Sequence, residues 1–389
     1  MSSNILVPGI MQIGAGASLC LPEVLVQLGV KKPLFITGPV VTKYGYLKRV
    51  TDTLDAAGIA YGVFNDVPND PTTQTVKDSL AALAESDYDC VVGLGGGSPM
   101  DTAKAVSLLA VKGGEVRDYK APLNNSVPGL PVIAIPTTAG TGSEATRVTI
   151  ITDAESDEKM LLMGRAFMPV AALVDFEMTL TMPYRLTADT GIDSMTHAME
   201  AYVSRKANMF SDALALAAMK IIYKNIRKVC DDLSNREARE AMMLGACQAG
   251  MAFSNASVAL VHGMSRPIGA NFHVPHGLSN AMLLPAVTAF SVPHCVERYA
   301  DCARAMAMVP ADCDDATANK VLLEELQRLN DDLEVPSPED YGIDRSRFMD
   351  LLPTMAEQAI ASGSPGNNPV IPSTDEIIAI YKDIYSNNS

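Results

Sequence analysis

The sequence has no tryptophan, and aromatic residues of all kinds make up only 5% of it. Proteins that bind single-stranded nucleic acid stack bases on aromatic side chains, so this class is disfavoured. Basic residues are also scarce, because 30 Lys and Arg stand against 45 Asp and Glu, giving a net charge of −15. Such a field repels the phosphates of nucleic acids and of anionic membranes, so neither is an expected partner.

The cysteines form no motif in the sequence. The seven cysteines are scattered along the chain and include no C-x-x-C pair. An odd number of isolated thiols is typical of a reducing compartment, rather than of a disulfide framework or a thiolate zinc site. Residues 1–14 show neither the basic nor the apolar segment of a secretory signal. We therefore expect a cytoplasmic protein.

Two long stretches contain no charged residue, Ala241–Ser265 and Pro267–Val296. The first is rich in Ala, Gly, Ser and Asn, which favours a buried helix over a membrane span. The second is interrupted by three prolines, at 275, 285 and 293, which do not suit one spanning helix.

The length of 389 residues predicts two or three domains, and a hydrophobic content of 48% predicts a large core. In the first part of the chain, apolar strand-like runs alternate with helical stretches, which is typical of βαβ units in a mostly parallel sheet. The predicted strands are Pro33–Thr37, Tyr88–Leu94 and Leu130–Ile135, and the predicted helices include Lys43–Gly58 and Thr73–Ser86.

Beyond residue 182 the pattern becomes almost wholly helical. The predicted helices are Thr187–Val203, Ser211–Val229, Arg236–Ser254, Ala316–Asn330 and Asp375–Tyr385. We therefore predict an α/β domain over residues 1–182 and an all-helical domain over residues 183–389.

A glycine-rich turn follows the second predicted strand. The segment Cys90–Asp101 reads CVVGLGGGSPMD, in which Ser98 suits a helix N-cap, Pro99 the first helical position and Asp101 a capping box. Glycines let a ligand approach the backbone, and a helix N-terminus offers free N–H groups to an anion. The turn is therefore a candidate phosphate site, with a tight turn that binds nothing as the alternative. No Walker motif is present, which disfavours a P-loop NTPase.

A second loop of the same kind, Pro136–Glu144, reads PTTAGTGSE and follows the third predicted strand. It supplies hydroxyl groups beside glycines. Parallel α/β sheets bind ligands at the carboxyl ends of their strands, so the two loops together favour a nucleotide site more than either does alone.

Histidine is rare, and three of the five histidines lie between residues 262 and 276. Asp193 and His197 are spaced to share one face of a helix, so both can bind one ion. Together with His262 and His276 they offer oxygen and nitrogen donors that suit Fe(II), Zn(II), Mn(II) or Ni(II). A solvated Asp–His pair and a core histidine at 262 are the alternatives.

Five segments together resemble the iron-containing alcohol dehydrogenase family, which shares its fold with glycerol dehydrogenase and dehydroquinate synthase. They are GGGSPMDTAK (Gly95–Lys104), PTTAGTGSE (Pro136–Glu144), GIDSMTHAMEAY (Gly191–Tyr202), NASVALVHGMSRPIG (Asn255–Gly269) and PHGLSNAMLLP (Pro275–Pro285). The resemblance covers nearly the whole chain. It implies an α/β N-terminal dinucleotide-binding domain, an all-helical C-terminal metal-binding domain, and a homodimer or larger homo-oligomer.

The resemblance also implies roles for single residues. The implied ligands are Asp193, His197, His262 and His276, holding Fe2+ or else Zn2+ or another divalent metal. The residues implied in binding NAD or NADP are Asn69, Gly96, Gly97, Ser98, Thr137, Thr138 and Thr141, to which the glycine-rich turn adds Gly95 and Asp101. Lys159 matches a family lysine near the nicotinamide and the substrate. His273 is either a proton relay or an ordinary loop histidine.

Two positions depart from the family pattern. Where NAD-preferring members often carry an acidic residue that holds the ribose hydroxyls, this sequence has Gly38, so NADP is expected to be accepted. Where many members have a second histidine after His262, this sequence has Arg266. A guanidinium is a fixed cation with a bidentate fork, so we expect Arg266 to bind a substrate carboxylate. Pairing with an internal acid or with a cofactor phosphate is the alternative.

The expected activity is a metal-dependent alcohol dehydrogenase or aldehyde reductase. A divalent ion acts as a Lewis acid that lowers the pKa of an alcohol, and the nicotinamide exchanges hydride with a small primary alcohol or aldehyde. An ω-hydroxy acid or its semialdehyde is the expected substrate class. The competing hypotheses are a dehydroquinate-synthase-like lyase, a metallohydrolase with structural glycine loops, and a regulator that binds without turnover.

Overall fold

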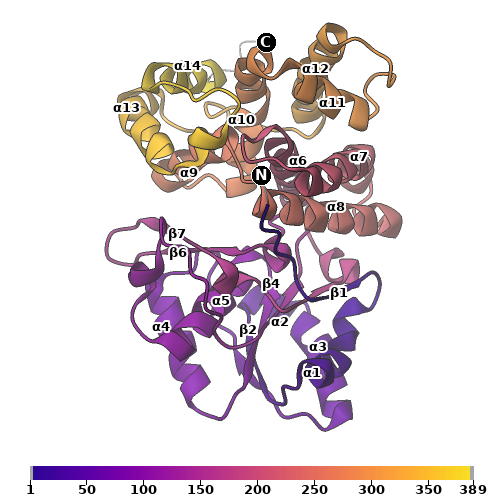
Figure 1. Cartoon of the computed structure of the whole chain (residues 1–389), viewed down its shortest axis with the longest axis vertical. Coiled ribbons are helices and arrows are strands. Elements are labelled where there is room, and N and C mark those ends of the chain that lie inside the picture. Colours follow the sequence, from indigo (N-terminus) through magenta and orange to yellow (C-terminus); the bar gives the residue numbers. More distant parts are fainter. Residues whose placement is uncertain (1–2, 386–389) are drawn as a thin grey trace. The chain divides into compact units, whose positions relative to one another are not determined.

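The computed structural model describes residues 3–385, which form two compact units (Figure 1). One unit comprises residues 4–182 and the other residues 183–385 together with residue 3. The chain thus divides between Met182 and Pro183.

A parallel sheet of six strands forms the centre of the first unit, in the order β1-β8-β5-β4-β2-β3. The strands are β1 (Ile10–Ile13), β2 (Pro33–Ile36), β3 (Gly62–Phe64), β4 (Cys90–Gly95), β5 (Val132–Pro136) and β8 (Ala171–Val174). Val91 and Val92 of β4 face opposite sides and are both fully buried. Both faces of the sheet are therefore covered, as a continuous apolar strand requires.

Helices cover the two faces of this sheet (Figure 1). They are α1 (Leu21–Leu28), α2 (Pro39–Lys43), α3 (Tyr46–Ala57), α4 (Thr73–Ala84) and α5 (Gly97–Lys112). Leu25 of α1 and Leu54 of α3 join the core on one face, whereas Val76 of α4 and Ala103 of α5 join the core on the other. The predicted α/β class with a mostly parallel sheet is confirmed.

Two local features differ from the sequence prediction. The helix expected over residues 43–58 is α3, which begins only at Tyr46 after Gly45, whose φ is +78°, and the short helix α2, which ends at Lys43, was not predicted. The antiparallel hairpin of β6 (Val148–Thr152) and β7 (Lys159–Met163) was also not predicted. Its short strands interrupt the alternation of strand and helix on which the prediction relied.

The second unit contains helices and no strand among its described residues, which confirms the predicted helical region. Its helices are α6 (Tyr184–Val203), α7 (Met209–Asp231), α8 (Arg236–Asn255), α9 (Leu260–Phe272), α10 (His276–Ser291), α11 (Val296–Ala305), α12 (Asp315–Asp332), α13 (Arg345–Ala361) and α14 (Thr374–Tyr385). Helix α6 packs against α7, α8 and α10. It is buried along almost its whole length, so its polar residues lie inside the protein.

The first uncharged stretch is not one helix. It breaks after Asn255, where α8 ends, and α9 begins at Leu260. Between residues 3 and 385 no single helix is both long and apolar enough to cross a bilayer, although α8 and α9 together, bent by 104°, meet that criterion by length and composition.

Candidate functional site

Three predicted metal ligands converge in the helical unit. Single ligand atoms of Asp193, His262 and His276 all lie within 4.8 Å of one another. The Asp193 Oδ1 atom is 3.4 Å from His262 Nε2 and 3.9 Å from His276 Nε2. The side chains of Asp193 and His262 are buried, whereas 46% of the His276 side chain is exposed, so the cluster has one open side.

The three residues come from the starts or the middle of different helices. Asp193 lies in the middle of α6, and His262 lies in the first turn of α9 rather than near the end of a long helix. His276 was expected in a loop, but it is the first residue of α10, with Pro275 as the N-cap. Proline suits a helix start because a donor missing there costs no intrahelical bond.

His197 lies beside this cluster. Its Nε2 atom is 3.8 Å from Asp193 Oδ1, one helical turn away on α6. The imidazole is stacked between two rings, with centroids 4.3 Å from Phe253 and 4.4 Å from His262. The fourth predicted ligand therefore lies next to the other three, while the group that meets the mutual 4.8 Å limit has Asp193, His262 and His276 as its members.

The electrostatics of the cluster favour a bound cation. Burial alone raises the pKa of Asp193, but the neighbouring His197, His276 and His262 outweigh it and hold that pKa below its usual value. Burial lowers the pKa of His262, yet the Glu200 and Asp193 carboxylates raise it overall to about 9. The histidine positions thus lie in a field that attracts positive charge. Carboxylate oxygen with imidazole nitrogen is a donor set that fits a divalent ion such as Fe(II) or Zn(II).

Two residues of this site, Glu200 and Asn280, were not predicted from the sequence. The Glu200 carboxylate lies 2.6 Å from His262 Nδ1. The Asn280 Nδ2 atom donates to Asp193 Oδ1 over 2.6 Å and lies 3.2 Å from Nε2 of both His262 and His276. A signal for both was present, because Glu200 falls on the Asp193 face of α6 and Asn280 follows His276 by one helical turn.

Arg266 lies on α9, one turn after His262. Within residues 3–385 it forms neither a hydrogen bond nor an ion pair, and its Nε atom is buried without a partner. Burial lowers the pKa of Arg266 and the charge of Glu200 raises it, with a net decrease. Pairing with an internal acid, one alternative for this residue, is therefore not observed. His273 ends α9 in the left-handed region (φ +55°) and is exposed, and its role stays a prediction.

Helix α5 begins two residues earlier in the glycine-rich turn than expected. Gly96 is the N-cap and Gly97 the first helical residue, so the prediction that Ser98 caps the helix and Pro99 opens it was wrong. The Ser98 hydroxyl instead donates to the carbonyl oxygen of Asn69. A Cβ atom on Gly95 would lie 2.5 Å from the Pro99 ring, which is why the chain is glycine at that point.

The two candidate phosphate loops pack against each other. Cβ atoms on Gly96 and Gly97 would come within 3.5 Å of Thr138 and 3.2 Å of Thr141, respectively. The Thr137 N–H donates to the Gly95 carbonyl oxygen over 2.9 Å. Among the described residues the buried Thr138 hydroxyl has no hydrogen-bond partner. An unpaired hydroxyl beside a helix N-terminus fits an anionic group such as a pyrophosphate.

Asp101 has a different environment from the one expected of a cofactor contact. Its Oδ1 atom accepts from the Ser143 hydroxyl over 2.7 Å, and its Oδ2 atom accepts from the Ile150 N–H over 2.8 Å. The fully buried Lys104 ammonium donates to Ser143 Oγ, Thr146 Oγ1 and the Val148 carbonyl oxygen, at 2.8, 3.2 and 2.8 Å. Both residues therefore hold the loops in place.

The remaining predicted cofactor residues, Gly38, Asn69 and Lys159, belong to the same unit. Gly38 is the N-cap of α2, and a Cβ atom there would lie 2.8 Å from the Val67 carbonyl oxygen. Asn69 is exposed. Lys159 opens β7 and forms an ion pair with Asp70 over 3.0 Å. Their contact with a dinucleotide stays a prediction.

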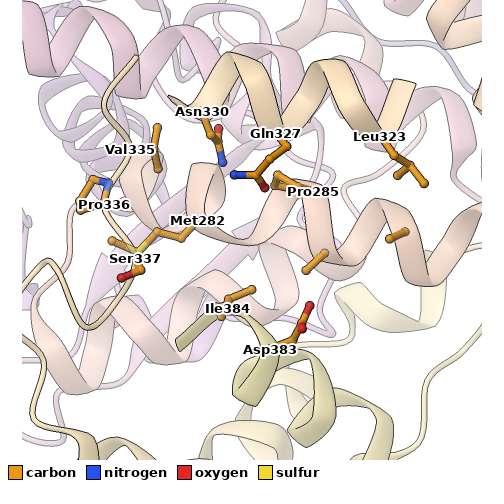
Figure 2. A pocket seen from close by; sticks show the side chains of 12 residues that line it. Met282, Pro285, Leu323, Gln327, Asn330, Val335, Pro336, Ser337, Asp383 and Ile384 are labelled. Carbon is orange, nitrogen blue, oxygen red and sulfur yellow. The ribbon is translucent and has the colours of Figure 1, made fainter. Parts of the chain in front are cut away.

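A cavity of about 240 Å³ lies elsewhere in the helical unit, among α10, α12 and α14. Figure 2 shows Asn330, Gln327 and Leu323 on one side of it and Asp383 and Ile384 on the other. Asp383 is the one ionisable residue in its lining. The cavity therefore lacks the grouped acids, bases or metal ligands of a catalytic site.

Comparison with known proteins matches both parts of the chain. The family model for iron-containing alcohol dehydrogenase matches residues 8–176, and the model for the C-terminal part of the Fe-containing alcohol dehydrogenase family matches residues 187–385. The chain is 35% identical over 372 residues to the lactaldehyde reductase of Escherichia coli, covering 95% of this chain and 96% of that protein.

Two solved structures extend this comparison. The structure of a 1,3-propanediol oxidoreductase has a TM-score of 0.94 and 33% identity, covering 99% of this chain and 100% of that chain. A sulfoacetaldehyde reductase from Bifidobacterium kashiwanohense in complex with NAD+ has a TM-score of 0.89 and 25% identity, covering 100% of both chains.

Proposed function

Since this chain belongs to the iron-containing alcohol dehydrogenase family, we propose that it interconverts a small primary alcohol and its aldehyde at a site held by Asp193, His197, His262 and His276. Family membership makes the chain an alcohol dehydrogenase and implies a metal and a nicotinamide dinucleotide. The observation that carries the assignment of the ligands is the convergence of Asp193, His262 and His276 within 4.8 Å. We propose Fe2+ as the resident ion.

The chemistry divides between the bound groups and the chain. When bound, a divalent cation polarises the substrate oxygen and a nicotinamide exchanges hydride. Asp193 supplies a carboxylate that its histidine neighbours keep ionised, because they hold its pKa low. In the other unit, the α5 N-terminus and the unpaired Thr138 hydroxyl hold the pyrophosphate of the dinucleotide. The chain thereby binds and orients the reactants.

We assign the substrate to small aldehydes that carry a carboxylate or a similar anion. Arg266 supports this class, because its buried Nε atom lacks a partner within residues 3–385 and one helical turn separates it from His262. A guanidinium binds a carboxylate through two parallel hydrogen bonds. The named substrate of one structural relative, sulfoacetaldehyde, also carries an anionic group beside its aldehyde. An ω-hydroxy acid and its semialdehyde fit this description.

We propose that NADP is accepted along with NAD. Gly38 supports this, because it presents no carboxylate that would repel a 2′-phosphate. None of the seven cysteines, all of which lie within residues 3–385, forms a disulfide bond, which supports a reducing, cytoplasmic compartment. A homodimer or larger homo-oligomer stays a prediction.

The test is a rate assay on protein stripped of metal and reconstituted anaerobically with Fe(II). Loss of reduced nicotinamide absorbance is followed with NADH and with NADPH, on matched neutral and carboxylate-bearing aldehydes. We expect turnover that depends on iron and is faster with the carboxylate-bearing aldehyde. Absence of turnover with either iron or zinc, despite dinucleotide binding, would favour the lyase or regulator hypotheses instead.

A further inference from the structure

Glu200 lies on α6 and is buried, with 4% of its surface exposed. Its carboxylate receives three hydrogen bonds from the start of α9. The Oε2 atom accepts from the Ala259 N–H over 2.9 Å, and the Oε1 atom accepts from the Val261 N–H over 2.6 Å. The third contact joins Oε2 to His262 Nδ1 over 2.6 Å. Glu200 thus caps one helix from another, and the same oxygen reaches a candidate metal ligand.

The backbone contacts decide the direction of the histidine contact. A backbone N–H can only donate, so both Glu200 oxygens are acceptors in this arrangement. The Nδ1 atom of His262 therefore carries its proton and donates it to Oε2. In the neutral ring, which is the form that binds a cation, Nε2 is then the nitrogen with a lone pair, and it lies 3.4 Å from Asp193 Oδ1. The second nitrogen of a metal-binding histidine commonly makes such a contact, which fixes the tautomer and the ring orientation.

An amide cannot replace the carboxylate at this place. A glutamine has one acceptor oxygen, so in one orientation its NH2 group meets the N–H of Val261, and in the other it meets the N–H of Ala259 and the Nδ1 proton of His262. Both orientations set donor against donor. The site therefore requires two acceptor oxygens.

His262 is the one residue within residues 3–385 that forms an ion pair with Glu200, whereas the charge of Arg266 acts on Glu200 only from beyond ion-pair distance. A buried carboxylate without a Lys or Arg partner is costly unless hydrogen bonds or a nearby cation compensate it. For Glu200 this compensation comes from two N–H groups at the start of α9 and from the His262 ring, whose Nε2 atom lies on the side of Asp193.

We propose that Glu200 is a positioning residue for cation binding, which holds His262 in the tautomer and orientation that present Nε2 to the ion. The inference rests on the proposed function, because it assumes that His262 is a metal ligand. It predicts that loss of the carboxylate weakens cation binding, and that this loss of affinity can be measured in the absence of turnover.

The experiment measures cation affinity without catalysis. Metal-stripped protein is titrated with Co(II) against a competing chelator, and the visible spectrum of the bound ion is recorded. We expect Glu200→Gln to weaken Co(II) binding by about 10- to 100-fold and to alter the spectrum. The matched control is Asp301→Asn, which makes the same chemical change at a carboxylate that accepts the Tyr202 hydroxyl, and it is expected to bind Co(II) like the unsubstituted chain.

A double-mutant cycle separates positioning from general damage to the fold. In a His262→Ala background the further effect of Glu200→Gln on Co(II) affinity should vanish, because Glu200 acts through that ring. If Glu200→Gln does not fold, Glu200→Asp takes its place. It keeps two acceptor oxygens on a shorter arm and is expected to bind Co(II) more weakly than the unsubstituted chain, again only when His262 is present.

The outcomes are distinguishable. If the unsubstituted chain binds no Co(II), the proposed metal site fails, and this inference fails with it. If that chain binds Co(II) and Glu200→Gln binds it equally well, the positioning role alone is overturned. An equal loss with and without His262 would also overturn it.

Discussion

The Lys104 ammonium donates a hydrogen bond to the Ser143 hydroxyl over 2.8 Å. Lys104 comes from α5, which begins at the glycine-rich turn, and Ser143 comes from the second candidate phosphate loop. The same hydroxyl donates to Asp101 over 2.7 Å. The contact fixes two loops, far apart in sequence, in one arrangement before any ligand binds.

Lys104 should give the stability of the fold a distinct pH dependence. Burial lowers the pKa of Lys104 to about 8, despite attraction by Asp101 and Glu144, whereas the ordinary value is 10.5. Between these values the unfolded chain holds a proton that the folded chain lacks, so the lysine makes stability rise with pH. We expect the free energy of unfolding, relative to that of Lys104→Met, to increase over this window in denaturant titrations. A difference that does not change with pH would contradict the lowered pKa.

Loss of a metal ligand should remove the metal and turnover together. Asp193→Ala and His262→Ala each delete one donor from the cluster, and we expect affinity for the cation to fall by more than about 100-fold, beyond the effect of an outer contact. Metal content after dialysis and the rate of aldehyde reduction are the measurements. His294→Ala is the control, because that exposed histidine lies outside the cluster. A ligand variant that lacks metal yet keeps the unsubstituted rate would refute the assignment.

Arg266 should discriminate between acidic and neutral substrates. Hydrogen bonds to charged groups contribute about 1.5–3 kcal/mol, so Arg266→His is expected to lower kcat/KM for a carboxylate-bearing aldehyde by about 10- to 100-fold. The neutral aldehyde of similar size is the internal control and should change little. Arg266→Lys keeps the charge but loses the fork, so an intermediate loss is expected. Equal losses on both aldehydes would show that Arg266 does not bind the substrate carboxylate.

Gly38 should influence the choice of dinucleotide. Gly38→Asp adds a carboxylate at the N-terminus of α2, so we expect the ratio of kcat/KM for NADH to that for NADPH to rise. The new Cβ atom would also lie 2.8 Å from the Val67 carbonyl oxygen, so a loss of stability is expected. Gly38→Ala carries the same steric change without charge and is the matched control. The prediction fails if both variants change the ratio equally.

Much of the fold could be predicted from local patterns. The continuous apolar run before the second loop predicted β5, because a strand that is buried on both faces needs apolar residues throughout. The length and composition of residues 187–203 predicted most of α6, although many of its buried residues are polar. The end of α8 was predicted to within one residue, but α9 was not predicted as a separate helix, since the residues between Asn255 and Leu260 are small and uncharged like their neighbours. The start of α5 was predicted two residues too late. Its N-cap is a glycine, which lacks the polar side chain by which an N-cap is recognised in a sequence.

The chain's own sequence determined which donors are available: Asp193 and His197 share a helix face through their spacing, and the rare histidines are concentrated near His262. Only the tertiary structure decided how they combine. Packing of α6, α9 and α10 brings Asp193, His262 and His276 within 4.8 Å, and it places Glu200 behind His262 and leaves Arg266 without a partner among the described residues. Local sequence encodes spacing along one helix, whereas contacts between helices depend on how their buried faces pack, which no single segment contains.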